Sequence, residues 1–147
     1  MNNVVIGLML EQGALAPCYA SVGAAGLDLR AYLKENILLL PGESTLVPTG
    51  IKLEVPPGFE VQIRPRSGLA LKDQITVLNT PGTIDADYRG EIKVILINHG
   101  KKPFIIEPQM RIAQMIVAPC YQAEFIIKEN LSTSLRGANG FGHSGLD

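Results

Sequence analysis

The sequence predicts an all-β fold, a jelly-roll-like barrel or sandwich with at most one short helix, from three observations. Short apolar runs alternate with polar residues, turn-forming residues recur about every ten positions, and no window of about eleven residues keeps a helical period. Ten prolines and fifteen glycines match that many turns. At 147 residues the chain is expected to form one domain that buries about 70% of its unfolded surface.

The expected strands are the runs richest in β-branched and aromatic residues. They are residues 4–10, 51–55, 59–63, 75–78, 92–97, 104–106, 112–117 and 125–127. The second and third are predicted to pair as a hairpin around Pro56-Pro57-Gly58, because apolar residues occupy every other position of both. The best helix candidate is one or two turns around residues 69–73.

Charge and hydropathy argue against a nucleic-acid-binding or membrane-spanning protein. Thirteen basic and fourteen acidic residues give a net charge of −1, whereas proteins that follow a nucleic-acid backbone usually carry a strong basic excess. A hydrophobic fraction of 46% and a mean hydropathy of +0.19 are high for a small chain. No apolar run approaches the ~18 residues of a membrane helix, so the apolar excess predicts subunit contacts.

Two further features bear on the compartment. The N-terminal run VVIGLML is short and no basic residue precedes it, so a signal peptide is not expected and a cytoplasmic location is. Cys18 and Cys120 form neither a disulfide framework nor a zinc cluster. We expect them to be isolated buried thiols in a reducing compartment.

Six arginines fall in short polar segments, and most of the seven lysines lie elsewhere. A guanidinium presents a fork of donors that grips phosphate or carboxylate, although arginines also form structural ion pairs. Arg66-Ser67-Gly68 follows a predicted strand and opens the predicted helix. Free backbone N–H groups and a hydroxyl there can form an anion site, and a plain serine helix cap is the alternative.

The segment 136–145 is rich in glycine and comes close to the phosphate-loop pattern G-x-x-x-x-G-K-S, with His143 in place of lysine. Only three residues follow Ser144, so no helix can present its N-terminus there and the pattern is rejected. We interpret the segment as an arm whose amides and Arg136 close over phosphates while Phe141 lies on a flat ring. The alternative is a chain end without function.

Other chemistries lack the residues that they need. A cupin-type metal site requires clustered histidines, and this chain has only His99 and His143. A zinc deaminase requires H-x-E and P-C-x-x-C, but no second cysteine follows Cys120. No G-x-S-x-G elbow of a serine hydrolase is present.

Five segments, read together, closely resemble the five ordered motifs of the trimeric dUTPases. They are AGLDLRA (25–31), PRSGLALK (65–72), GTIDADYRGE (82–91), RIAQM (111–115) and RGANGFGHSG (136–145). They occur in the family's order and approximate spacing, from about residue 25 to the end of the chain. The resemblance implies a dUTPase-like barrel over residues 1–135 and a flexible, glycine-rich lid arm of the same domain over residues 136–147.

The resemblance implies hydrolysis of dUTP to dUMP and pyrophosphate with Mg²⁺, which keeps uracil out of DNA and supplies dUMP for dTTP synthesis. Asp85 takes the role of the aspartate that orients and activates the attacking water at the α-phosphorus. Asp28 matches the aspartate that approaches the metal through water. Asp87 receives no catalytic role and is expected to brace a hairpin over residues 82–91 or to pair with an arginine.

The resemblance also implies a set of substrate-binding residues. They are Arg66, Ser67, Gly68, Asn79, Gly82, Thr83, Ile84, Tyr88, Lys93, Gln114, Arg136, Phe141, Gly142 and Ser144. The hairpin backbone, Asn79 and Lys93 are expected to bind uracil and to exclude thymine and cytosine. Tyr88 is expected to stack under the deoxyribose. The arm closes over the substrate, with Phe141 over the uracil ring.

Family members of this length form homotrimers with three composite sites at subunit interfaces, so the same assembly is expected here, without a nucleic-acid or membrane partner. Two alternatives remain. One is a dCTP deaminase, or a bifunctional deaminase and dUTPase, of the same fold, although such chains are typically longer. The other is a nucleotide-binding regulatory trimer that has lost catalysis.

Overall fold

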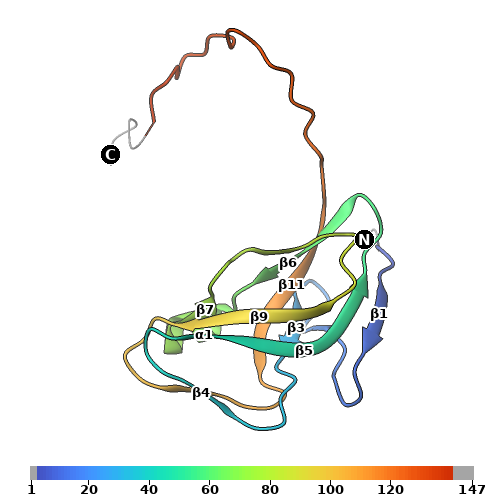
Figure 1. Ribbon diagram of the computed structural model, residues 1–147, viewed down its shortest axis with the longest axis vertical. Helices are drawn as coiled ribbons and strands as arrows, with labels where there is room; N and C mark the ends of the chain where they lie inside the picture. Colours follow the sequence, from blue (N-terminus) through green and yellow to red (C-terminus); the bar gives the residue numbers. More distant parts are fainter. Residues whose placement is uncertain (1–2, 141–147) are drawn as a thin grey trace.

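The computed structural model describes residues 3–140, and it has eleven strands and one short helix within that range (Figure 1). The strands are β1 (Gly7–Leu10), β2 (Cys18–Tyr19), β3 (Leu27–Arg30), β4 (Ile37–Leu39), β5 (Ser44–Glu54), β6 (Phe59–Arg64), β7 (Ile75–Val77), β8 (Gly82–Ile84), β9 (Glu91–Asn98), β10 (Phe104–Ile106) and β11 (Arg111–Pro119). The helix is α1 (Ser67–Asp73). The predicted fold class is confirmed, and so is the helix. No helix within residues 3–140 has the length and apolar character needed to cross a membrane.

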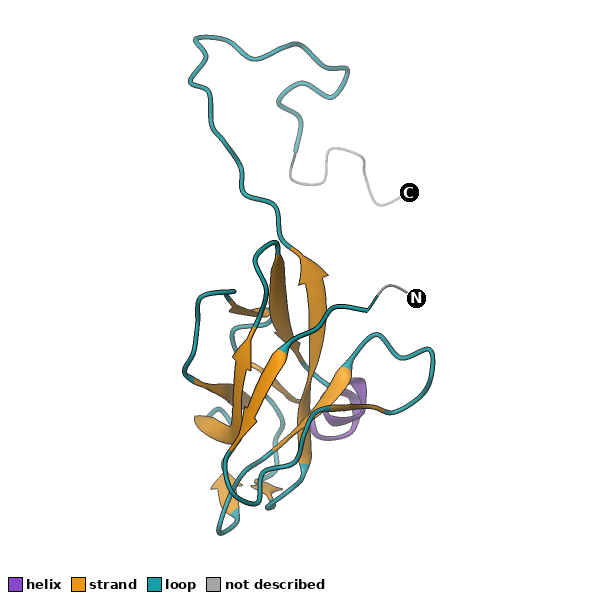
Figure 2. Ribbon diagram, turned by 90° about the vertical axis from the view of Figure 1, so that its right-hand side faces the viewer, coloured by secondary structure: helices purple, strands orange, loops and turns teal. Residues whose placement is uncertain are grey.

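The strands form two main antiparallel sheets and one small one. One sheet has the order β1-β5-β9-β7, and the other has the order β2-β3-β11-β6-β8. Strands β10 and β4 make a two-stranded ribbon. Figure 2 shows the strands gathered into one body, with the chain after β11 running away from it as an extended segment.

The core lies between the two main sheets, because alternate side chains of each strand point inward. Val47 and Leu96 come from one sheet and Leu29 and Val61 from the other, and all four are fully buried. Burying one such side chain stabilises the fold by about 1.5–3 kcal/mol. This repeated burial explains the alternation seen in the sequence.

The predicted hairpin over residues 51–63 is wrong, although both of its strands are present. Strand β5 pairs with β1 and β9, whereas β6 pairs with β11 and β8. The turn at Pro56–Gly58 therefore carries the chain from one sheet to the other. The alternation has the same appearance in both cases, because the two strands bury their apolar faces against opposite sides of one core.

The predicted hairpin over residues 82–91 is also wrong. Strand β8 pairs with β6 at the edge of the five-stranded sheet, and β9 lies in the four-stranded sheet. Residues 85–90 connect the two sheets as a loop. Four short strands were not predicted, namely β2, β3, β4 and β8. They are two to four residues long and do not repeat a pattern often enough to be recognised.

Residues 125–127 were predicted as a strand, but they form none. Phe125, Ile126 and Ile127 are all exposed, since these strand-forming residues find no partner strand among residues 3–140. The expectation of buried thiols is wrong for the isolated chain, because Cys18 and Cys120 are both exposed. Cys18 lies in the edge strand β2, and Cys120 follows the last residue of β11, so neither has a covering layer.

A bulge in β5 shapes the neighbouring part of β9. The register between the two strands shifts between Pro48 and Ile51. Gly50 has a φ of +68°, and a Cβ at this position would lie 2.6 Å from that of Ala14, so only glycine fits. The buried Thr49 hydroxyl donates a 2.6 Å hydrogen bond to the carbonyl of Ile92. The bulge thus fixes the start of β9, where the predicted site residue Lys93 lies.

Candidate active site

Most of the predicted site residues fall into two groups on each chain. The first is called the phosphate-side residues and comprises Asp28, Arg66, Ser67, Gly68 and Gln114. The second is the nucleoside group, which comprises Asn79, Gly82, Thr83, Ile84, Asp85, Tyr88 and Lys93.

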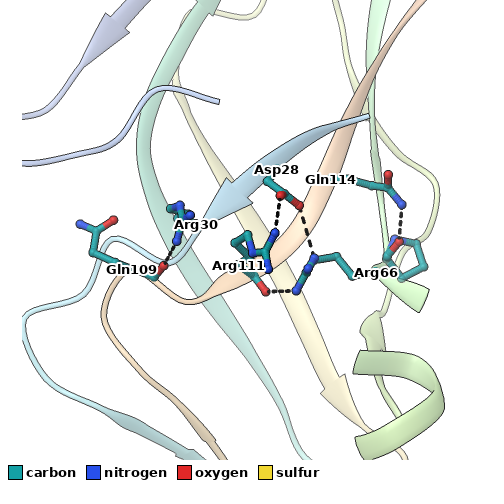
Figure 3. A network of polar contacts seen from close by, with 7 residues as sticks. Asp28, Arg30, Arg66, Gln109, Arg111 and Gln114 are labelled. Atoms are coloured by element: carbon teal, nitrogen blue, oxygen red, sulfur yellow. Dashed lines mark hydrogen bonds and ion pairs between the residues drawn. The ribbon is translucent and has the colours of Figure 1, made fainter. Parts of the chain in front are cut away.

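Two guanidinium groups flank the carboxylate of Asp28, as Figure 3 shows. Arg111 Nη1 donates a 3.0 Å hydrogen bond to Asp28 Oδ2, and Arg66 Nε lies 3.4 Å from Oδ1. Arg66 Nη1 also donates to the Arg111 carbonyl at 3.0 Å. Two cations beside one anion leave a net positive charge. Their remaining N–H donors can bind an anion such as phosphate.

The other phosphate-side residues lie close to this cluster. Gln114 pairs in register with Asp28 on one side and Arg64 on the other, and its Nε2 donates to the Pro65 carbonyl at 3.0 Å. Ser67 and Gly68 form the exposed first turn of α1. Arg66, not Ser67, is the N-cap residue, and no side chain caps this end. The plain serine cap considered from the sequence is therefore absent, which leaves the Ser67 hydroxyl available to a ligand.

Five members of the nucleoside group line one cavity of about 410 Å³. These are Thr83, Ile84, Asp85, Tyr88 and Lys93, and Leu46, Glu91 and Ile92 complete the wall. Gly82 begins β8 and is buried against Ile63, with the Asn79 side chain beside it. The cavity therefore joins an edge strand, the loop 85–90 and the start of β9 from the opposite sheet.

Hydrogen bonds within the loop 85–90 hold its shape. The Tyr88 hydroxyl donates to the Glu91 carbonyl at 3.0 Å. Arg89 Nη1 donates to the carbonyls of Ala86, at 2.6 Å, and Tyr88, at 3.0 Å. The exposed carboxylate of Asp85 stands at the start of this loop, where water can reach it.

Asp87 departs from expectation. None of the ion pairs or side-chain hydrogen bonds found among residues 3–140 involves it, and Arg89 instead faces Glu54 at 4.0 Å. Asp87 lines a second cavity, of about 760 Å³, together with Asp85 and Phe59. The prediction that Asp87 braces a hairpin or pairs with an arginine is not supported by these contacts.

The predicted lid is described only in part. Arg136 is exposed in the extended segment beyond β11, and its Nε donates to the Asn139 carbonyl at 2.8 Å. Within the described chain Arg136 contacts neither group of site residues. Phe141, Gly142 and Ser144 lie outside the described residues, as does His143.

The donor set near Asp28 suits one kind of metal binding. Within residues 3–140 no cluster of three or more histidine, cysteine or acidic side chains could hold a metal ion. Mg²⁺ usually keeps several waters and binds through one or two carboxylates together with substrate phosphates. The Asp28 carboxylate has lone pairs left beside its two guanidiniums. It therefore fits a water-mediated contact to a cation carried by phosphates, and does not fit a metal held by the protein alone.

The β8 end of the nucleoside group and Gln114 lie apart on the five-stranded sheet, whereas Lys93 lies on the other main sheet. The register places Ile84 opposite Val61 and Val61 opposite Val117, three residues along β11 from Gln114. Three residues correspond to roughly 10 Å along the strands, and the two intervening strand spacings add roughly 10 Å across them. Asp85 follows Ile84 and lies farther still from Gln114 of the same chain.

Two charged residues of the site were missed from the sequence. Arg111 lies in the segment RIAQM, yet its contact with Asp28 spans 83 positions and no local pattern reveals it. Glu91 lines the nucleoside cavity, and its side chain bonds to the β5 bulge. The only available signal was the position of both residues inside the quoted motifs.

Comparisons with known proteins agree on one family. A family model described as dUTPase matches residues 13–145. A Chlamydia pneumoniae protein named deoxyuridine 5'-triphosphate nucleotidohydrolase is 61% identical over 137 residues, which cover 92% of this chain and 94% of the relative. A protein of the same name from Chlamydia trachomatis serovar D is 54% identical, with the same coverage.

Solved structures show the same fold. The Staphylococcus bacteriophage 80alpha dUTPase with dUpNHpp has a TM-score of 0.88 at 24% identity, covering 97% of this chain and 99% of that chain. A mutant dUTPase from phage phi11 of S. aureus has a TM-score of 0.77 at 20% identity, covering 86% of this chain and 97% of that chain. The latter structure is described as revealing the coordination of a structural Mg(II) ion.

Proposed function

This chain belongs to the dUTPase family, and from that premise we propose that it hydrolyses dUTP to dUMP and pyrophosphate. The observation that carries the proposal is the cavity between β8 and β9, where Asp85 stands beside an edge strand, a tyrosine and a lysine. A nucleoside in that cavity would place its α-phosphate near the Asp85 carboxylate.

The proposed chemistry begins with a water molecule held by Asp85. The water oxygen forms a bond to the α-phosphorus, the bond from that phosphorus to the α,β-bridging oxygen breaks, and Asp85 accepts a water proton. Pyrophosphate leaves with the bridging oxygen. Asp85 is exposed and lines the cavity, so its carboxylate can reach such a water. Positioning and charge neutralisation account for most of the rate enhancement in phosphoryl transfer.

The phosphate-side residues would bind the triphosphate of dUTP. Arg66 and Gln114 face it with N–H donors, while Ser67 and Gly68 offer a hydroxyl and backbone N–H groups. Asp28 orients the Arg66 guanidinium and, through water, would meet Mg²⁺ that the substrate carries. Mg²⁺ bound there neutralises charge on the phosphates.

Selectivity for deoxyuridine would come from the nucleoside group. The described ladders pair β8 only with β6, so the backbone N–H and C=O groups of its other edge are available to the uracil edge. The Asn79 side chain lies beside Gly82, and Lys93 lines the same cavity as Thr83 and Ile84. Tyr88 is anchored through its hydroxyl, and its ring would lie under the deoxyribose where a 2′-hydroxyl has no room.

We further propose a homotrimer with three composite sites, in which Asp85 of one chain faces the phosphate-side residues of another chain. The separation of the two groups supports this assembly, and so does apolar surface left open on the single chain. Examples are Phe125, Ile127 and Leu135, which are 89%, 98% and 110% exposed. Residues 136–147 would act as the lid arm of the barrel domain formed by residues 1–135. The reaction would take place in the cytoplasm, removing dUTP and supplying dUMP for dTTP synthesis.

The test is to incubate purified protein and Mg²⁺ separately with dUTP, dCTP, dTTP and UTP while following pyrophosphate and ammonia. Pyrophosphate from dUTP alone, without ammonia, is the expected result. Ammonia from dCTP would indicate a deaminase of the same fold. Nucleotide binding without any product would indicate a regulatory protein without catalysis.

A further inference from the structure

Glu91 connects two residues that line the nucleoside cavity to the β5 bulge behind it. Its Oε1 accepts a 2.9 Å hydrogen bond from the Gly50 N–H at the β5 bulge. Its Oε2 lies 3.6 Å from the Lys93 ammonium, and its backbone carbonyl accepts the Tyr88 hydroxyl at 3.0 Å. One residue therefore links the β5 bulge to Lys93 and Tyr88, which line the cavity together with Glu91 itself.

The side chain of Glu91 is only 22% exposed, whereas that of Lys93 is 44% exposed. The Gly50 N–H holds the carboxylate in place, because the bulge removes that donor from the regular β5–β9 ladder. A held carboxylate is a fixed anchor for a flexible ammonium. Without the Glu91 carboxylate, each binding event would have to order the flexible Lys93 side chain, and the lost conformational entropy would weaken ligand binding.

We propose that Glu91 is a positioning residue for the proposed dUTPase reaction, which holds the Lys93 ammonium at the nucleoside cavity before substrate binds. The inference rests on the proposed function and adds a residue to its binding machinery. Glu91 acts through Lys93 and does not contact the reacting atoms. Its effect therefore falls on substrate binding, while the rate of the chemical step at Asp85 stays the same.

The test uses Glu91→Gln, Lys93→Met and the double variant, with dUTP and Mg²⁺. In Glu91→Gln the new amide oxygen can still accept the Gly50 N–H, but the neutral group no longer holds the ammonium. Ordering a free lysine on binding is expected to raise KM about three- to tenfold. The kcat should stay within about twofold of the parent value. Lys93→Met should raise KM similarly, and adding Glu91→Gln to it should raise KM no further.

Glu11→Gln is the matched control. Glu11 forms a lysine–glutamate pair with Lys52 at 3.1 Å in which the carboxylate is more exposed, and neither residue lines the nucleoside cavity. This variant should leave both KM and kcat unchanged, and thermal unfolding should show that all variants remain folded.

Three results would overturn the inference while leaving the proposed function in place. The first is an unchanged KM in Glu91→Gln. The second is a fall in both kcat and melting temperature in that variant. The third is a double variant whose rise in KM equals the product of the rises in the two single variants. Absence of dUTP turnover in the parent protein would overturn the proposed function, and the inference with it.

Discussion

Two impaired variants should restore each other's activity if each site draws on two chains. Asp85→Asn removes the general base, whose loss is expected to lower the rate about 10²–10⁴-fold. Arg66→Gln removes a charge-assisted donor to phosphate, worth about 1.5–3 kcal/mol, which corresponds to a roughly 10- to 150-fold loss. Ile84, next to Asp85, is roughly 10 Å along the sheet and roughly 10 Å across it from Gln114 of the same chain.

The size of the rescue follows from random assembly. In an equal mixture, half of all sites receive Asp85 from an Arg66→Gln chain. Half of those face the intact Arg66 of an Asp85→Asn neighbour, so about a quarter of the sites are complete. The mixture should therefore release pyrophosphate from dUTP at about a quarter of the parent rate, well above either variant alone.

The assay compares chains mixed before assembly, by co-expression or joint refolding, with the same proteins mixed after assembly and measured at once. Only the first sample should gain activity. If joint assembly yields mixed oligomers by mass spectrometry but no rate above that of Arg66→Gln alone, Asp85 and Arg66 act within one chain. The composite site would then be wrong.

Three further outcomes are expected. Asp85→Asn should still bind dUTP by calorimetry while scarcely hydrolysing it, and full activity in this variant would remove Asp85 as the base. Deleting residues 136–147 should abolish turnover without changing the oligomer measured by light scattering, and a monomeric product would contradict the role as a lid. Leu96→Ala should lower the free energy of unfolding by about 2–5 kcal/mol in urea titration, because Leu96 is fully buried between the sheets. A change below about 1 kcal/mol would be incompatible with that packing.

Local sequence patterns determined the all-β class and most of the longer core strands, but not β3 and β4, which bury Leu29 and Leu39. Ile51, Leu53 and Val55 alternate with polar residues because each strand buries one face, and this periodicity is visible in the chain itself. The resemblance of the motif segments to dUTPases implied most members of both site groups, whereas Asn79 and Lys93 lie outside those segments. Helix α1 was predictable from its local sequence.

Only the tertiary structure decided which strands pair and which charges meet. Alternation shows that one face of a strand is buried, but it does not select the partner strand, so β5 and β6 had the pattern of a hairpin and joined different sheets. Asp28 meets Arg111, and Glu91 meets Gly50, across 83 and 41 positions of the chain. Such contacts depend on how the whole chain packs, because packing brings together groups that no local pattern relates.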